Sequence, residues 1–368
     1  MKNKKPIMGW SSWNHFRTDI SEEMVKGQAD AMLATGLMDA GYSFVNIDDG
    51  YFGGRKEDGM LFEDLDKFPS GMKSLADYIH SKGLKAGIYS EAGCNTCASY
   101  TKLDNFDPKG KGVGLYGFDK KDIKLFFKDW GYDFLKVDWC GGLRQGLNAQ
   151  KRYSEISAHV REIAPDAVFN VCRWKFPGEW VADIADSWRI SGDIEPKFGP
   201  AIIPGTIMNI VEKNRKLAPY AGPGHYNDMD MLQVGRGMSE DEDKAHFSMW
   251  CMMSSPLLAG NDLRDMSPQT ISILTNPDLI AINQDALGQQ AVRVKKRFGI
   301  QIWYKALEGG RTAIAVLNTT GRIRKLEIDL SIWFNTETVR ECWSGETYDV
   351  NQQGELKLNP HGIAVFLN

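Results

Sequence analysis

Long apolar segments are missing from this sequence. No stretch of its 368 residues approaches the ~18 consecutive apolar residues of a membrane-spanning helix. The first residues, MKNKKPIMGW, also lack the apolar core of a signal peptide. Taken literally, the chain is cytoplasmic, although an exported protein whose signal had been removed and replaced by a methionine would look the same.

The chain also has no large excess of positive or negative charge, and it has few metal-binding patterns. The net charge is −4 and the isoelectric point is about 5.9, so electrostatics give no reason to expect nucleic acid or an anionic membrane as a partner. Cys94 and Cys97 form a C-x-x-C, but no second C-x-x-C and no H-x-x-x-H follows. Neither a zinc site nor thioredoxin-like chemistry is therefore predicted. The six cysteines fit either free thiols or one disulfide in an exported protein.

A dinucleotide-binding glycine motif is absent too, although short apolar strands alternate with helical segments over most of the chain. Such alternation predicts a parallel sheet with right-handed crossovers, and the number of strands favours a (β/α)8 TIM barrel. A doubly wound sheet is the alternative, but no G-x-G-x-x-G follows the first strand. The expected strands are PIMGWSSW (6–13), SFVNIDD (43–49), LKAGIYS (84–90), DFLKVDW (133–139), AVFNVC (167–172), DSWRIS (186–191), GHYNDMDML (224–232) and SPLLAG (255–260).

Helical periodicity occupies the intervals between these strands. Ser21 is the predicted N-cap of a helix that ends at Gly41, and Ser70 is predicted to begin the next helix in the same way. Further helices are expected over 119–131, 147–165 and 240–253.

The last part of the chain has a different pattern. After about Gln290 the apolar segments are short, alternate with polar residues and are separated by Gly, Asn and Asp. We therefore predict a catalytic barrel over 1–290 and a C-terminal antiparallel β-sandwich over 291–368.

The segment YDFLKVDWCGG (132–142) places charges at the end of an apolar strand. Side chains alternate along a strand, so Phe134, Lys136 and Asp138 share one face. The carboxyl ends of barrel strands form the catalytic rim, which puts Asp138 at the mouth with Lys136 just below. The ammonium group favours an ionised carboxylate, as a nucleophile requires.

Polar clusters recur at other expected strand ends. A single aspartate after a strand is more often a turn former or a helix cap, but several clusters predict a polar pocket, because burying unpaired charges is costly. Two carboxylates, one held ionised and one able to donate a proton, meet the requirements of glycoside hydrolysis. The remaining rim candidates are Asn46, Asp48, Asp49, Arg189, Ser191, Asp193, Asp228 and Asp230, with Trp10, Trp13, Trp139 and Trp174 as walls for a sugar ring or as core residues.

The motifs around these residues resemble glycoside hydrolase family 27, which contains α-galactosidases, α-N-acetylgalactosaminidases and some β-L-arabinopyranosidases. The resemblance covers nearly the whole chain and is strongest to the α-galactosidases. It implies a (β/α)8 barrel with a β-sandwich, and a retaining mechanism through a covalent glycosyl-enzyme without a cofactor. The motifs, in family order, are MGWSSWNHF, VNIDDGY, GIYSEAG, LKVDWC, SWRISGDI, AGPGHYNDMDML and SPLLAGNDLRDMS with IAINQDALGQQ.

This resemblance also implies a role for individual residues. Asp138 matches the nucleophile and Asp193 the acid/base, while Asp48 and Asp49 match the pair that binds O4 and O6 of galactose. The other sugar-binding matches are Lys136 and Arg189 to hydroxyls, Trp13 as an aromatic floor, Cys172 and Trp174 near O2, and Met231 in the pocket wall. Cys97 and Cys140 match a family disulfide, which favours a secreted or periplasmic protein.

Departures from the family pattern affect specificity. Glu91 stands where an aspartate is commoner, and the loop between Cys97 and Cys140 carries an insertion over 98–117. VCRW lacks the small residues that accommodate an N-acetyl group, which favours a 2-hydroxyl substrate. Because Asp48 and Asp49 would lose a partner without the C6 hydroxymethyl group, we expect galactosides to be better substrates than β-L-arabinopyranosides.

Three alternatives stay open at this point. They are a β-L-arabinopyranosidase or an enzyme of mixed specificity, a non-catalytic galactose-binding protein, and a metal-dependent barrel such as a sugar isomerase. The expected partner is a carbohydrate substrate, with no nucleic acid and no membrane, and a homo-oligomer is not excluded.

Overall fold

The computed structural model describes residues 5–100 and 106–368, and the chain divides into two compact units. Unit 1 consists mainly of Ile7–Ile190 and Leu258–Asp265, and unit 2 mainly of Ser191–Leu257 and Met266–Asn368. The expected domain boundary after residue 290 is defined along the chain rather than by these units, and it stays a prediction.

Parallel strands form the centre of unit 1. They lie in the order β10-β1-β2-β5-β6-β7-β8, and pairing is parallel from β1 to β8. Buried residues occupy β1, β2, β7 and β8 throughout. The strands span β1 Met8–Ser11, β2 Phe44–Asn46, β5 Lys85–Glu91, β6 Phe134–Asp138, β7 Val168–Val171, β8 Ser187–Arg189 and β10 Leu257–Ala259.

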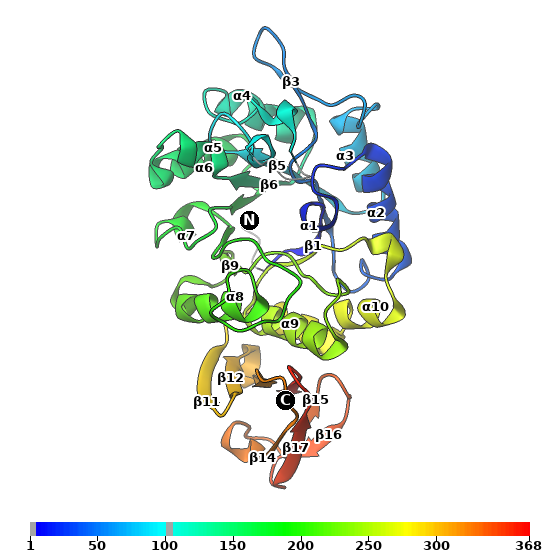
Figure 1. Ribbon diagram of the computed structural model, residues 1–368, viewed down its shortest axis with the longest axis vertical. Coiled ribbons are helices and arrows are strands. Elements are labelled where there is room, and N and C mark those ends of the chain that lie inside the picture. The colour runs from blue at the N-terminus through cyan, green and yellow to red at the C-terminus, as the bar shows by residue number, and fades with distance from the viewer. Residues whose placement is uncertain (1–4, 101–105) are drawn as a thin grey trace. The chain divides into compact units, whose positions relative to one another are not determined.

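Helices of unit 1 lie around the outside of these strands (Figure 1). The predicted N-cap Ser21 is confirmed, because its hydroxyl accepts the backbone N–H of Met24. The helices are α1 Trp13–Phe16, α2 Glu22–Ala34, α3 Met72–Ser81, α4 Asp119–Lys124 with a π-turn η3 Leu125–Asp129, α5 Cys140–Arg144, α6 Ala149–Ile163 and α7 Val181–Ile184, with 3₁₀ turns η1 Cys97–Ser99, η2 Pro108–Gly110 and η5 Leu263–Asp265.

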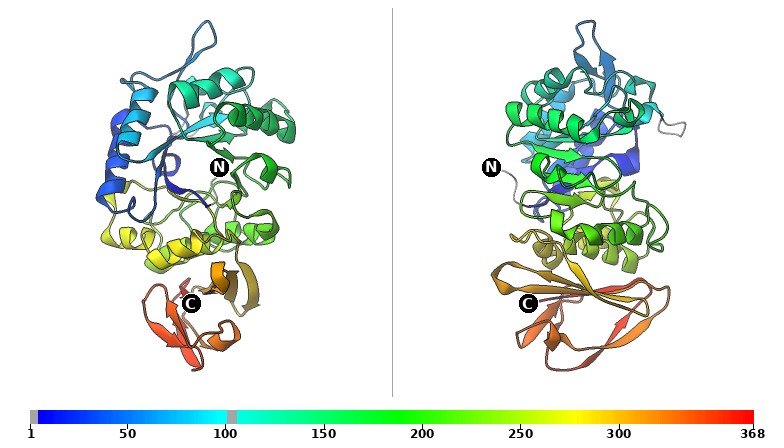
Figure 2. Two further views of the ribbon diagram at one scale, coloured as in Figure 1. Left: turned by 180° about the vertical axis from the view of Figure 1, so that it is seen from behind. Right: turned by 90° about the vertical axis from the view of Figure 1, so that its left-hand side faces the viewer.

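In unit 1 one expected helix cap was wrong, and one hairpin was not expected. Ser70 does not cap α3: Gly71 occupies the N-cap position, and the Glu63 carboxylate accepts the N–H of Met72 instead. Sequence reasoning also missed a hairpin of β3 (Phe52–Arg55) and β4 (Leu61–Glu63), which projects from the rest of unit 1 (Figure 2). The Glu63 carboxylate on β4 thus accepts a backbone N–H of the first turn of α3, as Ser70 was expected to do.

Unit 2 combines helices with an antiparallel β-sheet. The sheet has the order β11-β12-β13-β18-β15-β16, and β14 pairs with β17 separately. Helix α9 begins with a capping box of Ser239 and Glu242. The elements are α8 Ile207–Asn214, η4 Arg215–Tyr220, β9 Tyr226–Asp228, α9 Glu240–Met252, α10 Pro268–Leu274, α11 Pro277–Asn283, β11 Val292–Arg297, β12 Ile300–Ala306, η6 Glu308–Gly310, β13 Thr312–Asn318, β14 Arg324–Ile328, η7 Leu330–Ile332, β15 Thr338–Glu341, β16 Thr347–Asp349, β17 Gly354–Leu358 and β18 Ile363–Leu367.

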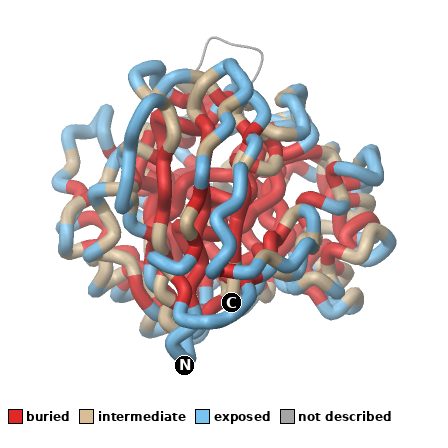
Figure 3. Tube along the Cα trace, turned by 90° about the horizontal axis from the view of Figure 1, so that it is seen from below, coloured by how far each residue is buried: buried red, intermediate tan, exposed pale blue. Residues whose placement is uncertain are grey.

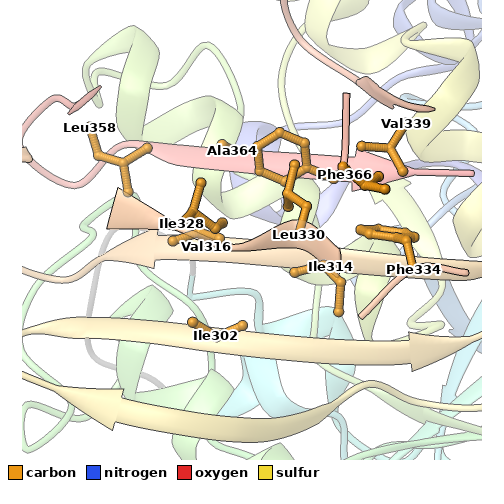
Figure 4. Packing of buried hydrophobic residues seen from close by; sticks show 11 residues of the cluster. Ile302, Ile314, Val316, Ile328, Leu330, Phe334, Val339, Leu358, Ala364 and Phe366 are labelled. Atoms are coloured by element: carbon orange, nitrogen blue, oxygen red, sulfur yellow. The ribbon is translucent and has the colours of Figure 1, made fainter. Parts of the chain in front are cut away.

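A single apolar cluster holds the two C-terminal sheets together. Ile302, Ile314 and Phe366 from the larger sheet meet Ile328 and Leu358 from the β14–β17 pair (Figure 4). The alternation of more buried and more exposed positions expected after Gln290 appears in β14 and β15, whereas every residue of β13 is buried. Burial differs among these strands, since β13 is buried throughout and β11 is mostly exposed; Figure 3 colours the trace by burial.

Among the described residues, no helix is both long enough and apolar enough to span a bilayer.

Candidate active site

The carboxyl ends of β2 and β6 bring a lysine and an aspartate into a buried ion pair. Lys136 Nζ lies 2.8 Å from Asp48 Oδ2, and the Asp48 side chain is only 3% exposed. Burial alone would lower the pKa of Lys136, but the charges of Asp48, Cys172 and Asp138 raise it well above its ordinary value. The sequence predicted Lys136 below Asp138 on one strand, and the structure adds its hydrogen bond across the sheet to Asp48.

Backbone groups fix the orientation of Asp48. Its Oδ1 accepts the N–H of Asp49 at 2.9 Å, and its own N–H donates to the Ser12 hydroxyl at 2.9 Å. Both carboxylate oxygens of Asp48 thus have a donor, and Ser12 ties the end of β1 to the end of β2. A substrate hydroxyl would add to a group that is already held in one position.

Asp49 is also completely buried, but it faces a different partner. Its Oδ1 accepts the N–H of Gly50, and its Oδ2 accepts the N–H of Ala98, both at 2.9 Å. Burial raises the pKa of Asp49 to about 7, in spite of the Ala98 hydrogen bond, and the charges of Asp48 and Asp138 add to the rise. Asp49 therefore connects the end of β2 with the turn η1.

Asp138 ends β6 and is 6% exposed. Its Oδ1 accepts the N–H of Trp139 at 3.0 Å, and its backbone carbonyl accepts the N–H of Ala92 at 3.0 Å. The Tyr153 hydroxyl lies against the carbonyl oxygens of Asp138, at 3.3 Å, and Cys172, at 3.0 Å. These contacts fix the backbone on both sides of the carboxylate.

Glu91, whose role was open in the sequence, serves as a cap for the segment after Asp138. Its Oε1 accepts the N–H groups of Gly93, at 3.0 Å, and Gly142, at 3.1 Å, and its Oε2 accepts the N–H of Cys140 at 2.9 Å. Burial, followed by the charge of Asp138, raises the pKa of Glu91 to about 8, while the backbone N–H groups oppose the rise. Glu91 therefore joins the end of β5 to the start of α5.

The disulfide expected from the family resemblance is present. Cys97 and Cys140 are bonded, with their Cα atoms 5.1 Å apart and a separation of 43 positions in the sequence. The bond fixes η1 against the start of α5, next to the Glu91 carboxylate. Cys94, the other cysteine of the C-x-x-C, lies outside this bond, and its sulfur accepts from the Gln145 amide at 3.1 Å.

The remaining unit 1 candidates lie at the ends of β7 and β8 and in α1. Arg189 is 3% exposed, and its Nη1 lies 3.8 Å from the sulfur of the buried Cys172. Trp174 is partly exposed and has a left-handed backbone with φ 57°, which is uncommon for a bulky residue. Trp13 is also partly exposed, with the Arg17 guanidinium 5.4 Å from its ring.

Two of the tryptophans considered as sugar walls are packed in the interior. Trp10 is fully buried and donates to the carbonyl of Asn261, and Trp139 is 3% exposed with its ring 5.2 Å from that of Tyr153. For these two the core interpretation applies, whereas Trp13 and Trp174 keep partial exposure.

Unit 2 carries Asp193 and Met231. Asp193 lies in an exposed loop, and the N–H of the next residue, Ile194, donates to Asp230 Oδ2 at 2.9 Å. Asp230 has φ 79°, and its Oδ1 accepts the N–H of the buried Met231 at 2.8 Å. Asp230 therefore fixes both segments, a role that its position at a strand end did not reveal.

The described residues contain no set of side chains suited to hold a resident metal ion. The one group of His, Cys, Asp and Glu with matching spacing consists of Glu91, Cys97 and Cys140. Its two sulfur atoms are joined in the disulfide and so are not thiolate ligands.

Comparison with known proteins identifies relatives along nearly the whole chain. Residues 5–285 match the family model described as Alpha galactosidase A, and residues 298–368 match that of the alpha galactosidase C-terminal beta sandwich domain. Alpha-galactosidase A of Cellvibrio japonicus is 39% identical over 98% of this chain and 91% of its own length.

Solved structures agree as well. Alpha-galactosidase I of Mortierella vinacea matches 99% of this chain and 97% of its own with a TM-score of 0.90 and 29% identity. A β-L-arabinopyranosidase of Geobacillus stearothermophilus shares the fold with a TM-score of 0.83, at 23% identity over 99% of this chain and 96% of its own.

These matches define the chain as a glycoside hydrolase with the predicted fold, a (β/α)8 barrel followed by an antiparallel β-sandwich. It belongs to glycoside hydrolase family 27, the family of the α-galactosidases.

Proposed function

We propose that the chain hydrolyses terminal α-D-galactosyl residues with retention of configuration, with Asp138 as nucleophile and Asp193 as acid/base. The observation that carries the assignment of Asp138 is its burial at the end of β6, two positions after Lys136 on the same strand. A nearby cation favours the ionised carboxylate, which is the form that attacks.

Two displacements complete the reaction. The Asp138 carboxylate forms a bond to the anomeric carbon while the bond to the leaving oxygen breaks, and Asp193 gives that oxygen its proton. A water molecule then loses a proton to Asp193, attacks the anomeric carbon and releases Asp138 as the carboxylate. Both residues return to their starting protonation states.

The proposal assigns a sugar-binding role to eight further residues. Asp48 accepts from O4 and Asp49 from O6, while Lys136 and Arg189 donate to hydroxyl groups. Trp13 supplies an apolar surface for one face of the ring. Cys172 and Trp174 lie near O2, and Met231 completes the wall. The barrel of 1–290 carries this chemistry, and the sandwich of 291–368 follows it.

Galactosides are the preferred substrates in this proposal, ahead of β-L-arabinopyranosides. The arabinoside lacks the hydroxymethyl group at C6, so a buried acceptor would lose its partner at a cost of roughly 1–3 kcal/mol. That cost corresponds to roughly 5- to 150-fold in kcat/KM between nitrophenyl α-galactoside and nitrophenyl β-L-arabinopyranoside. Equal or reversed values would assign the arabinopyranosidase activity instead.

Azide rescue tests the two carboxylates separately. Asp138→Ala should lower turnover of nitrophenyl α-galactoside by roughly 10⁴-fold or more, and azide should then yield β-galactosyl azide. Asp193→Ala should keep bond cleavage with this good leaving group, and azide should yield α-galactosyl azide through the glycosyl-enzyme. Asp77→Asn, an exposed carboxylate on α3, is the matched control.

The assignment of Asp138 fails if its alanine variant stays within tenfold of the wild-type rate. Binding of galactose without hydrolysis of any aryl galactoside by the wild type would instead favour a non-catalytic sugar-binding protein. A loss of activity in a strong chelator would revive the metal-dependent alternative.

A further inference from the structure

A cavity of about 560 Å³ opens in the C-terminal sandwich, and none of the residues assigned above lines it. The β11–β12 hairpin forms one side, and β14 with η7 forms the other. We call it the sandwich groove and define it by its lining residues, which are Lys295, Arg297, Phe298, Ile300, Ile302, Arg324, Lys325, Leu326, Glu327, Ile328, Asp329, Ile332 and Trp333.

The floor of the sandwich groove is apolar and rigid. Ile302 and Ile328 are buried members of the sandwich core (Figure 4). Ile332 is 68% exposed, and Trp333 is partly buried against the same core. The groove therefore offers an apolar surface on a packed scaffold.

Phe298 stands at the edge of the groove in a conformation that its side chain does not favour. It forms, with Gly299, the two-residue turn between the paired residues Arg297 and Ile300. Both turn residues have positive φ, 49° and 83°, as in the turn type that Asn-Gly normally supplies. This conformation costs a bulky residue free energy. Despite that cost, the Phe298 side chain is 75% exposed.

Four cations and two carboxylates, Glu327 and Asp329, line the groove, so its lining is positive although the chain as a whole is negative. Lys295 and Arg297 come from β11, and Arg324 and Lys325 come from β14. Within the described residues, only Lys325 of these four has a carboxylate partner, Glu355. The Arg297 guanidinium lies 4.7 Å from the centre of the Phe298 ring, so an aromatic face and a planar cation are held together.

We propose that the sandwich groove binds an acidic saccharide, with a sugar ring against Phe298 and its carboxylates on the cations of β11 and β14. One face of a pyranose ring is made of C–H groups and packs against an aromatic ring or an isoleucine. A guanidinium group matches a carboxylate with two parallel hydrogen bonds. The groove combines its cations with the apolar residues Ile302, Ile328 and Ile332, which suit the C–H face of a sugar ring better than a nucleic acid strand, whose affinity comes mainly from its phosphates.

Isothermal titration of the full chain with trigalacturonate, a short acidic oligosaccharide, tests this site. We expect saturable binding that weakens at least tenfold in Phe298→Asn and in the double variant Lys295→Gln/Arg297→Gln. Phe298→Asn should fold at least as stably as the wild type, because Asn-Gly is the preferred pair for this turn. Its loss of binding would therefore not reflect unfolding.

Lys296→Gln is the matched control. Lys296 lies on the same strand as Lys295 and Arg297, carries the same charge as both and does not line the groove. Its removal should change the affinity by less than twofold. All four proteins should hydrolyse nitrophenyl α-galactoside at the same rate, and the binding result holds whether or not that activity is found.

Three outcomes would overturn the proposal. One is the absence of saturable binding of trigalacturonate to the wild type. Another is equal binding of a neutral galactan trisaccharide that is unaffected by Lys295→Gln/Arg297→Gln, because the charges would then have no role. The last is equal binding of a short oligothymidylate of matched charge, which would indicate attraction of any polyanion rather than recognition of a sugar.

Discussion

Asp49 is a single residue whose carboxyl group keeps its proton in the folded protein to an unusually high pH. Both of its oxygens accept backbone N–H groups, yet complete burial beside Asp48 and Asp138 raises its pKa to about 7. Between about pH 4 and 7 the folded protein therefore binds a proton here that the unfolded chain has released. The contribution of Asp49 to the free energy of unfolding is present in full below that window and is lost as the pH rises through it.

Asp49→Asn should remove this pH dependence. The free energy of unfolding of the wild type minus that of the variant should fall between pH 4 and 7.5, by on the order of 4 kcal/mol in total. Urea unfolding at several pH values measures it. Asp77→Asn, which alters an exposed carboxylate paired with Lys73, should give a difference that changes little with pH. A constant difference for Asp49→Asn would show that Asp49 is ionised throughout.

The partner of Lys136 illustrates what a strand pattern can predict about single residues. Alternation correctly placed Lys136 and Asp138 on one strand near its end. It could not predict the hydrogen bond to Asp48, which depends on the register between β2, β5 and β6. Local periodicity gives the face of a side chain, whereas its partner depends on strands distant in the sequence.

Glu91 acts at the scale of elements, because it joins β5 to α5. Its carboxylate accepts from Gly93, Cys140 and Gly142, and Asp138 lies between the two elements in the chain. We therefore regard Glu91 as a positioning residue for Asp138. No sequence pattern marks this role, since two of the three donors, Cys140 and Gly142, are about fifty residues from Glu91.

Glu91→Gln should change kcat more than KM. A glutamine amide cannot accept all three N–H groups, so the variant should lose about 1–3 kcal/mol of unfolding free energy. Its kcat should fall by at least tenfold with KM within threefold, because Asp138 shifts while the Lys136–Asp48 pair stays in place. Steady-state kinetics on nitrophenyl α-galactoside and thermal unfolding check both effects.

Glu162→Gln, an exposed carboxylate on α6 paired with Lys120, is the control for Glu91→Gln and should leave both measurements unchanged. A Glu91→Gln variant that loses stability while kcat and KM stay at wild-type values would reduce Glu91 to a purely structural cap.

Elements themselves were predictable to different degrees. Apolar strands bounded by turn residues identified the parallel strands, and the capping box of α9 lies at the predicted helix start. The β3–β4 hairpin was missed, because its short strands contain Gly53, Gly54 and Arg55 instead of an apolar alternation. Its pairing to Leu61–Glu63 comes from the fold rather than from local preference.

At the scale of the whole molecule, the sequence divides the chain after residue 290, whereas spatial contacts group helices from before that point with the sandwich. Arg340 of β15 pairs with Asp278 of α11, and His361 approaches Glu242 of α9 at 2.7 Å. Trp343 donates to Ser248 of α9. These contacts join residues up to 119 positions apart, so they leave no trace in a local pattern.

Lys305 is the most buried of these connections within unit 2. It lies on β12 and is 1% exposed, and its Nζ donates to the carbonyl oxygens of Cys251 and Ile282, at 3.1 and 2.7 Å, and to the Ser254 hydroxyl at 2.8 Å. The two carbonyls belong to the last turns of α9 and α11, where helices leave carbonyl groups without an internal partner. One ammonium group thus holds two helix ends to the sandwich.

Lys305→Met should therefore weaken α9, α11 and β12 together. Methionine fills similar space but leaves three buried acceptors without a donor, at a cost on the order of 3 kcal/mol. Hydrogen exchange should show faster exchange of amides in all three elements, with thermal unfolding at a lower temperature. Lys325→Met, the same change at an exposed lysine of β14, should leave exchange in α9 and α11 at the wild-type rate. Faster exchange confined to β12 would mean that the helices and the sandwich unfold independently, and that the boundary after residue 290 is a folding boundary as well.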